Sequence, residues 1–199
     1  MKFYFVRHGE TEWNVLKKIQ GKTDVPLNEN GQNQAKALAA SLVEQKLHAV
    51  KIYTSPQLRA TQTAEIIGNA LHIECEELQG LIEMDLGEWE GSNWETIEEE
   101  YTQAYHNWNE HRRHVHTPGG ECYNEVLERT LDALKHILSK ENDNVIVVTH
   151  SAILMSLRVY LAKLPFEEMV RRFKTKNTEL VEIDASEIRE AIERFEAGE

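Results

Sequence analysis

The chain of 199 residues has the length of one ordinary domain, and its composition excludes several classes of protein. Hydrophobic residues make up 41% and charged residues 28% of it, as in water-soluble globular proteins, and no apolar run approaches the length of a membrane span. The net charge of −12 argues against nucleic acid as a partner. Cys75 and Cys122 indicate no disulfide framework, and the N-terminal residues do not resemble a signal peptide, so we expect a cytoplasmic protein.

The first half of the chain alternates predicted strands with predicted helices. The strands are expected over residues 2–6, 49–54 and 73–76. Asn28 is expected to cap the first helix, which carries apolar residues at helical spacing up to Val43. In the second helix Ser55 is the expected N-cap and Pro56 the first helical residue, and the helix should run to about His72.

The second half begins irregularly over residues 81–91 and then becomes mostly helical. Residues 94–111 predict a helical stretch within an insertion or lid at about 92–117, which Pro118-Gly119-Gly120 ends. Further elements are a helix from about Tyr123 to Leu138, a buried strand over 145–148, a helix to about Lys163, a strand over 179–184 and a helix from Ser186. This alternation predicts a single α/β domain over residues 1–199, a three-layer sandwich whose mainly parallel sheet is flanked by helices.

Two histidines directly follow predicted strands. His8 comes after the first strand and His150 after the strand that ends at Thr149. One histidine in such a place is typically a hydrogen-bonded structural residue, but two in matching positions, one of them beside Arg7, favour a ligand site at the carboxyl edge of the sheet. Arg59 could reach the same edge, or it could form a surface salt bridge with Glu65.

Five blocks of sequence carry the most specific pattern in the chain. They are RHGETEWN at 7–14, SPQLRATQTA at 55–64, LIEMDLGEWEG at 81–91, PGGE at 118–121 and VVTH at 147–150. Together and in this order they resemble the signature of the histidine phosphatase superfamily, in its phosphoglycerate mutase-like branch. The resemblance implies phosphoryl transfer through a phosphohistidine, without a metal or another cofactor.

The resemblance also implies roles for individual residues. His8 would be the nucleophile, and His150, Arg7 and Arg59 would bind and stabilise the transferring phosphoryl group. Arginine forks suit phosphate oxygens, and their charge should keep His8 neutral, so that one ring nitrogen can attack while the other donates to a backbone carbonyl. Glu83 would be the proton donor and later the base.

Other residues are assigned less directly. Alternatives to Glu83 as the proton donor are Glu10, Asp85, Glu88 and Glu90. Asn14, Gln20 and Gly21 align with a loop of the family that lines the phosphate site. Ser151 stands where the family often has glycine, and its hydroxyl could cap a helix or touch the phosphate. Cys122 replaces the serine usual after Pro-Gly-Gly-Glu, and we interpret it as a packing variant.

We therefore expect a phosphomonoesterase that acts on small phosphorylated metabolites. A phosphoglycerate mutase is the alternative within enzymes, and a non-catalytic phospholigand-binding or scaffold protein is the alternative from another class. The histidines at 106, 111, 114 and 116 lack a familiar metal-ligand spacing and are interpreted as solvated. With Arg112 and Arg113 they could instead form a basic rim that selects anionic substrates. A homodimer is compatible with the sequence, and a membrane partner is not expected.

Overall fold

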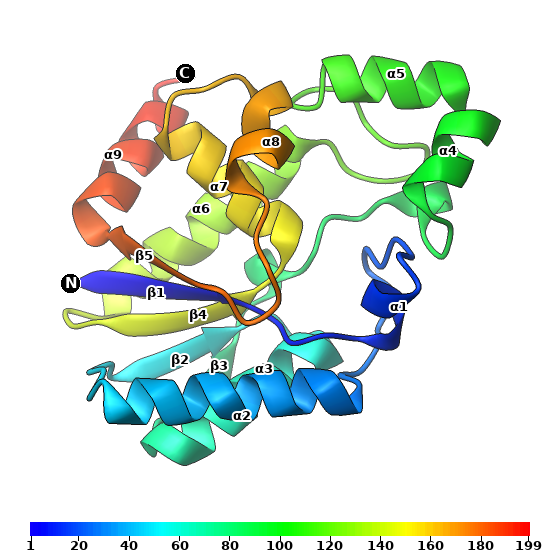
Figure 1. Ribbon diagram of the computed structural model, residues 1–199. Coiled ribbons are helices and arrows are strands. Elements are labelled where there is room, and N and C mark those ends of the chain that lie inside the picture. The colour runs from blue at the N-terminus through cyan, green and yellow to red at the C-terminus, as the bar shows by residue number, and fades with distance from the viewer.

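The computed structural model describes residues 1–199 and has one five-stranded sheet between two layers of helices (Figure 1). The strand order is β3-β2-β4-β1-β5, and every neighbouring pair is parallel except β1 with β5. Helices α2 and α3 cover one face of the sheet, and α6, α7 and α9 cover the other (Figure 1). The predicted three-layer α/β sandwich with a mainly parallel sheet is therefore confirmed.

The elements follow the predicted alternation closely. The strands are β1 (Lys2–Arg7), β2 (Lys51–Thr54), β3 (Cys75–Glu77), β4 (Val145–Thr149) and β5 (Leu180–Asp184). The α-helices are α1 (Glu12–Val15), α2 (Glu29–Glu44), α3 (Leu58–Leu71), α4 (Trp94–Glu100), α5 (Thr102–Glu110), α6 (Tyr123–Lys140), α7 (Ser151–Leu161), α8 (Met169–Phe173) and α9 (Ala185–Glu196). Short 3₁₀ helices occur at Gln79–Leu81, Gly87–Trp89 and Phe166–Glu168.

Successive residues of the central strands alternate between the two faces of the sheet. In β4, Val145 and Val147 join a core cluster of 32 buried residues, which includes apolar side chains of α6, α7 and α9. Ile146 and Val148 point the other way, into a cluster of 10 buried residues with α2 and α3. Because both faces are covered, β4 is buried along its whole length and its sequence is continuously apolar.

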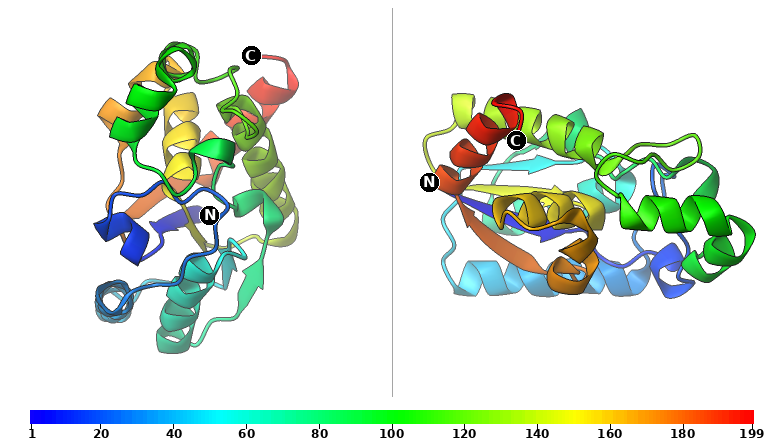
Figure 2. Two further views of the ribbon diagram at one scale, coloured as in Figure 1. Left: turned by 90° about the vertical axis from the view of Figure 1, so that its right-hand side faces the viewer. Right: turned by 90° about the horizontal axis from the view of Figure 1, so that it is seen from above.

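The segment 92–117, hereafter the lid segment, lies beyond the carboxyl ends of the parallel strands. It contains α4 and α5, which project from the body of the sandwich (Figure 2). Trp89 and Trp108 are fully or nearly fully buried where this segment meets the domain, with their rings edge-to-face at a centroid distance of 5.3 Å. Aromatic packing therefore fixes the lid segment over that end of the sheet. None of the helices combines the length and apolar character needed to cross a bilayer.

The predicted start of the second helix is wrong. Helix α3 starts at Leu58 with Gln57 as its N-cap residue, not at Pro56 with Ser55 as the cap. The first backbone N–H of α3 instead donates to the carboxylate of Asp24, at 2.7 Å, a contact from a loop that is distant in sequence. The mostly helical stretch predicted over 94–111 is confirmed as two helices, α4 and α5, which meet at Tyr101, whose φ of −116° and ψ of 31° lie outside helical geometry. The short helices α1 and α8 were not predicted.

Candidate active site

The register of the sheet brings the two strand-end histidines together. Arg7 at the end of β1 is paired with Thr149 at the end of β4, so His8 and His150 leave the sheet side by side. Their rings are 5.2 Å apart between centroids and inclined by 56°. Both side chains are buried, with exposed fractions of 2% and 0%. The predicted pairing of these histidines at one edge of the sheet is what the structure contains.

His8 has one ring nitrogen engaged and the other free. Its Nδ1 lies 2.7 Å from the carbonyl oxygen of Gly9, and because a carbonyl oxygen can only accept, Nδ1 carries the proton. The Nε2 atom therefore keeps its lone pair. Burial, followed by the charges of Arg59 and Arg7, holds the pKa of His8 well below its ordinary value, so the neutral ring persists at neutral pH.

In His150 the ring nitrogen with a hydrogen-bond partner is Nε2, whereas in His8 it is Nδ1. Nε2 of His150 lies 2.7 Å from the hydroxyl oxygen of Ser55, whereas its Nδ1 is buried without a hydrogen-bond partner. Burial and the charge of Arg59 also hold its pKa well below the ordinary value. A buried polar nitrogen without a hydrogen-bond partner is energetically costly, so Nδ1 of His150 is available to bind a ligand.

Arg7 and Arg59 both line the cavity that contains His8. Arg7 donates from Nη1 to the carbonyl oxygen of Thr175 at 2.6 Å, and Arg59 donates from Nη1 and Nη2 to the carbonyl oxygens of Thr23 and Gly21, both at 2.9 Å. In each guanidinium the Nε atom is buried and has no partner. Arg59 is fully buried, so the alternative of a surface salt bridge is wrong.

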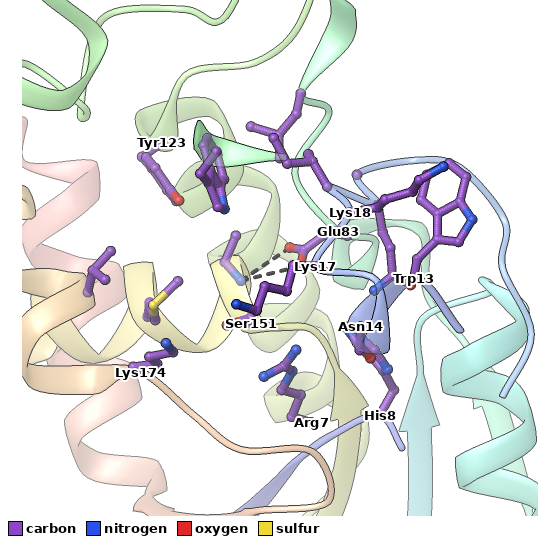
Figure 3. A pocket seen from close by; sticks show the side chains of 18 of the residues that line it. Arg7, His8, Trp13, Asn14, Lys17, Lys18, Glu83, Tyr123, Ser151 and Lys174 are labelled. Carbon is purple, nitrogen blue, oxygen red and sulfur yellow. Dashed lines mark hydrogen bonds between the residues drawn. The ribbon is translucent and has the colours of Figure 1, made fainter. Parts of the chain in front are cut away.

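Glu83 is the one carboxylate that lines the cavity beside His8 (Figure 3). Its Oε1 accepts the backbone N–H of Met84 at 3.0 Å and that of Ala152, in the first turn of α7, at 3.2 Å. Burial raises the pKa of Glu83, against the opposing charge of Arg59 and these two backbone donors. A raised pKa favours the protonated form of the carboxyl group, which a proton donor needs.

The four alternative carboxylates lie outside the cavity, and three of them have other partners. Glu10 accepts the side-chain amides of Asn28 and Asn30, and Asp85 forms an ion pair of 2.7 Å with Lys22. Glu90 accepts backbone N–H groups of residues 22 and 23, and Glu88 is exposed. None of the four lines the cavity that contains His8 and Glu83.

The remaining predicted binding residues all line this cavity. Asn14, Gln20, Gly21 and Ser151 contribute to its wall, and Figure 3 shows Asn14 and Ser151 beside His8 and Arg7. Ser151 is the first residue of α7 and provides no cap, because the N-cap residue is His150. Of the two roles predicted for its hydroxyl, the helix cap is therefore excluded.

Gly21 cannot be replaced without a rearrangement. Its φ is +50°, in the left-handed region that favours glycine, and a Cβ atom there would lie 1.9 Å from Oε1 of Glu90. Its carbonyl oxygen accepts hydrogen bonds from both Arg59 and the side chain of Gln57. The turn at Gly21 therefore positions an arginine of the site.

The cavity has a volume of about 640 Å³ and concentrates positive charge against the overall charge of the chain. Six cationic side chains line it, against the single carboxylate: Arg7, Lys17, Lys18, Arg59, Arg112 and Lys174. Its outer wall is aromatic, with Trp94, Tyr105, Trp108 and Tyr123. The four histidines of the predicted rim do not line it, and neither does Arg113. The excess of cationic side chains in this lining suits an anionic ligand.

Comparison with known proteins identifies the family. The family model for the histidine phosphatase superfamily (branch 1) matches residues 3–197. The chain belongs to the histidine phosphatase superfamily. The resemblance predicted from the five sequence blocks is thereby confirmed.

Individual relatives agree with this membership. The chain is 36% identical over 152 residues to "Phosphoserine phosphatase 1" of Hydrogenobacter thermophilus, covering 76% of this chain and 71% of the relative. It is 31% identical to the "6-phosphofructo-2-kinase/fructose-2,6-bisphosphatase" of Caenorhabditis elegans. That match covers 83% of this chain but only 35% of the longer relative. The solved structure of "Bacillus stearothermophilus YhfR" superimposes with a TM-score of 0.82 at 31% identity, over 92% of this chain and 90% of that one.

Two residues of this histidine phosphatase that support the site were missed by the sequence analysis. Arg129 in α6 donates to the carbonyl oxygens of Gly80, Ile82 and Glu83, and so holds the loop that carries the Glu83 carboxyl group. Gln57 accepts the backbone N–H of Glu83 at 2.8 Å. Gln57 stands within a block of the family pattern, which is a usable signal, but Arg129 reads as one charge among many on an amphipathic helix.

Proposed function

We propose that the chain is a phosphomonoesterase that transfers the phosphoryl group of a small phosphorylated metabolite first to His8 and then to water. One observation carries this proposal. Three buried nitrogen atoms around the neutral His8 ring have no hydrogen-bond partner: Nε of Arg7, Nε of Arg59 and Nδ1 of His150. A tetrahedral dianion would supply acceptors for all three, and two arginine charges would offset its own charge.

In the first step, the Nε2 lone pair of His8 attacks phosphorus. The N–P bond forms as the bond between phosphorus and the ester oxygen breaks, and the carboxyl group of Glu83 gives its proton to the leaving oxygen. Arg7, Arg59 and His150 stabilise the charge on the three non-bridging oxygens. Asn14, Gln20, Gly21 and Ser151 complete the wall around them.

In the second step, the carboxylate of Glu83 accepts a proton from water. The water oxygen attacks phosphorus, the N–P bond breaks and inorganic phosphate is formed. His8 recovers its lone pair and Glu83 recovers its proton, so both groups return to their starting state. The hydrogen bond from Nδ1 of His8 to Gly9 keeps the same tautomer throughout.

A phosphatase is favoured over the two alternatives. The two sequence relatives named above carry phosphatase or bisphosphatase names, which does not favour a mutase. A non-catalytic scaffold would have no use for a carboxyl group whose raised pKa suits proton transfer at the side of a neutral histidine.

The substrate class follows from the lining of the cavity. Beyond Arg7 and Arg59, cations such as Lys17, Lys174 and Arg112 line the same cavity. They favour a metabolite that carries a second anionic group besides the phosphate, a class to which phosphoserine, after which one relative is named, also belongs. We further propose that residues 1–199 work as one domain in the cytoplasm, with the lid segment forming the outer wall of its cavity.

The proposal is tested with p-nitrophenyl phosphate in the presence of a metal chelator. We expect hydrolysis by the wild type and a loss of at least about a thousandfold in His8→Ala, with no loss in His72→Ala, which changes an exposed histidine outside the cavity. Phosphate should be trapped covalently on the wild type after rapid denaturation, and not on His8→Ala. Equal rates in the wild type and His8→Ala would contradict the nucleophile assignment.

A second assay separates phosphatase from mutase and scaffold. With 3-phosphoglycerate and its bisphosphate primer, we expect release of inorganic phosphate to exceed formation of 2-phosphoglycerate. Faster formation of 2-phosphoglycerate would establish the mutase instead. Absence of turnover over a broad panel of phosphomonoesters would establish a binding protein.

A further inference from the structure

Outside the cavity, three side chains of different chemistry converge at the start of α6. They are the imidazole of His116, the thiol of Cys122 and the carboxylate of Glu125, and one ligand atom from each lies within 4.8 Å of the others. Nε2 of His116 is 3.0 Å from the carboxylate of Glu125. The sequence spacing has no familiar metal-ligand pattern, because the convergence depends on the turn at Pro118-Gly119-Gly120 that folds His116 back onto the helix.

We propose that His116, Cys122 and Glu125 form a three-ligand site for a zinc-type divalent cation. Thiolate, imidazole and carboxylate are the ligands that Zn²⁺ takes, whereas Mg²⁺ and Ca²⁺ select oxygen donors. Three protein ligands leave the fourth tetrahedral position for water, and His116 and Glu125 are exposed enough to admit it.

The charges at this site are balanced. Thiolate and carboxylate together carry two negative charges and would neutralise a divalent cation at the helix N-terminus. Cys122 binds a cation as the thiolate, so binding releases the thiol proton to the solvent.

The site lies where the lid segment ends and α6 begins. His116 belongs to the lid segment, while Cys122 is the N-cap residue of α6 and Glu125 the third residue of that helix. The backbone N–H of Tyr123 already donates to the carbonyl oxygen of Arg112, at 3.3 Å, and both of these residues line the cavity. A bound cation would thus add a link between the two segments that form the outer wall of the cavity.

The test uses Co²⁺ as a probe on the 199-residue protein freed of metal. We expect one equivalent to bind, with the near-ultraviolet absorption of a thiolate–cobalt bond and visible bands of four-coordinate geometry, and Zn²⁺ should displace it. Even the outer partners of metal ligands are worth about 10- to 100-fold in affinity, so His116→Gln should weaken binding at least about tenfold. Cys122→Ser, which keeps a favourable N-cap residue, should abolish the thiolate absorption.

Matched controls are available in the chain. His114→Gln changes an exposed neighbouring histidine, and Cys75→Ser changes the other cysteine, and neither should affect binding or the spectrum. Unchanged thermal unfolding of the metal-free variants shows that each is folded. The proposal is overturned if no cobalt binds in a one-to-one ratio, if the bound cobalt lacks thiolate absorption, or if that absorption persists in Cys122→Ser.

Discussion

The Nε2 atom of His150 lies 2.7 Å from the hydroxyl oxygen of Ser55, and this contact determines which ring nitrogen is left for a ligand. When the serine hydroxyl donates to Nε2, the proton of the neutral ring must be on Nδ1, the nitrogen without a partner. Ser55 thus acts through His150: it is a positioning residue for a hydrogen-bond donor of the proposed phosphate site.

Replacing Ser55 tests this relationship. In Ser55→Ala, both tautomers of His150 become available, and we expect kcat for p-nitrophenyl phosphate to fall by about tenfold, the value of one hydrogen bond. Ser139→Ala, which changes an exposed serine at the end of α6, should have wild-type activity. An unchanged kcat in folded Ser55→Ala would contradict the positioning role, and Ser55→Thr, which keeps the hydroxyl, should restore part of the rate.

Glu83→Gln should reveal the proton donor through the leaving group. The variant should lose at least about a hundredfold in kcat for an alkyl phosphate, and far less for p-nitrophenyl phosphate, whose leaving group barely needs a proton. In the wild type, the rate should fall at low pH as His8 is protonated, and at high pH as Glu83 loses its proton. Because the pKa of His8 is lowered, the loss of activity on the acid side should occur below the ordinary pKa of histidine. Because the pKa of Glu83 is raised, the loss on the alkaline side should occur above the ordinary pKa of glutamate. Equal losses for both substrates would argue against Glu83.

The two buried histidines should make stability depend on pH. Their pKa values are lowered in the folded state, so the unfolded chain binds more protons below about pH 6.5. The stabilisation that comes from the two neutral histidines is therefore fully present above about pH 6.5. Below that pH the free energy of unfolding falls by about 1.4 kcal/mol per pH unit for each histidine, down to the pKa of that histidine in the folded state. Urea unfolding at several pH values measures this slope. It should be smaller in the double variant His8→Asn/His150→Asn, and an equal slope would contradict the assignment.

Two glycines with similar backbone angles should differ in their tolerance of alanine. Gly21 and Gly119 have φ values of +50° and +71°, but a Cβ atom would meet Glu90 at the first and nothing within 4 Å at the second. Gly119→Ala should cost about 1 kcal/mol of stability from backbone strain alone. Gly21→Ala should cost more, and should also raise KM because Arg59 loses the geometry of its acceptor. Thermal unfolding and steady-state kinetics measure both, and equal effects would show that the steric contact is unimportant.

Arg112 and Arg113 are adjacent but should contribute differently to substrate recognition. Arg112 lies over the ring of Trp108 at 4.6 Å and lines the cavity, whereas Arg113 donates to Asn124 and does not line it. Arg112→Met should raise KM by about tenfold for phosphoserine, which has a second anionic group, and little for p-nitrophenyl phosphate. Arg113→Met should leave both KM values unchanged. A similar rise for both substrates would contradict selection by a second anion.

Patterns along the chain were sufficient for the fold and for the residues placed at the strand ends. Apolar runs such as 145–148 identify buried strands, and His8 and His150 could be placed together because parallel strands end at one edge of the sheet. The start of α3 was mispredicted because Ser55-Pro56 is a favourable local cap, while the actual cap contact comes from Asp24, 34 positions away. Contacts of this kind depend on packing between distant segments, which a local pattern does not encode.

The same limit applies to the supporting residues. Arg129 reaches the loop of Glu83 across 46 positions in sequence, and nothing in the helical pattern of α6 distinguishes it from other charged residues. His116 and Cys122 gave no metal signal for a similar reason, since their convergence requires the turn between them.

The division of the cavity between two stretches of chain has a consequence for how such an enzyme can diversify. His8, Arg59 and Glu83 come from the sheet edge, the first turn of α3 and a loop, whereas Trp94, Tyr105, Trp108 and Arg112 belong to the lid segment. Exchanging residues 92–117 for the corresponding stretch of a relative would alter the outer wall and leave the reacting groups in place. The lid segment is therefore a suitable unit to exchange in chimaeric proteins. Such an exchange would change substrate preference while the residues of the chemical step stay the same.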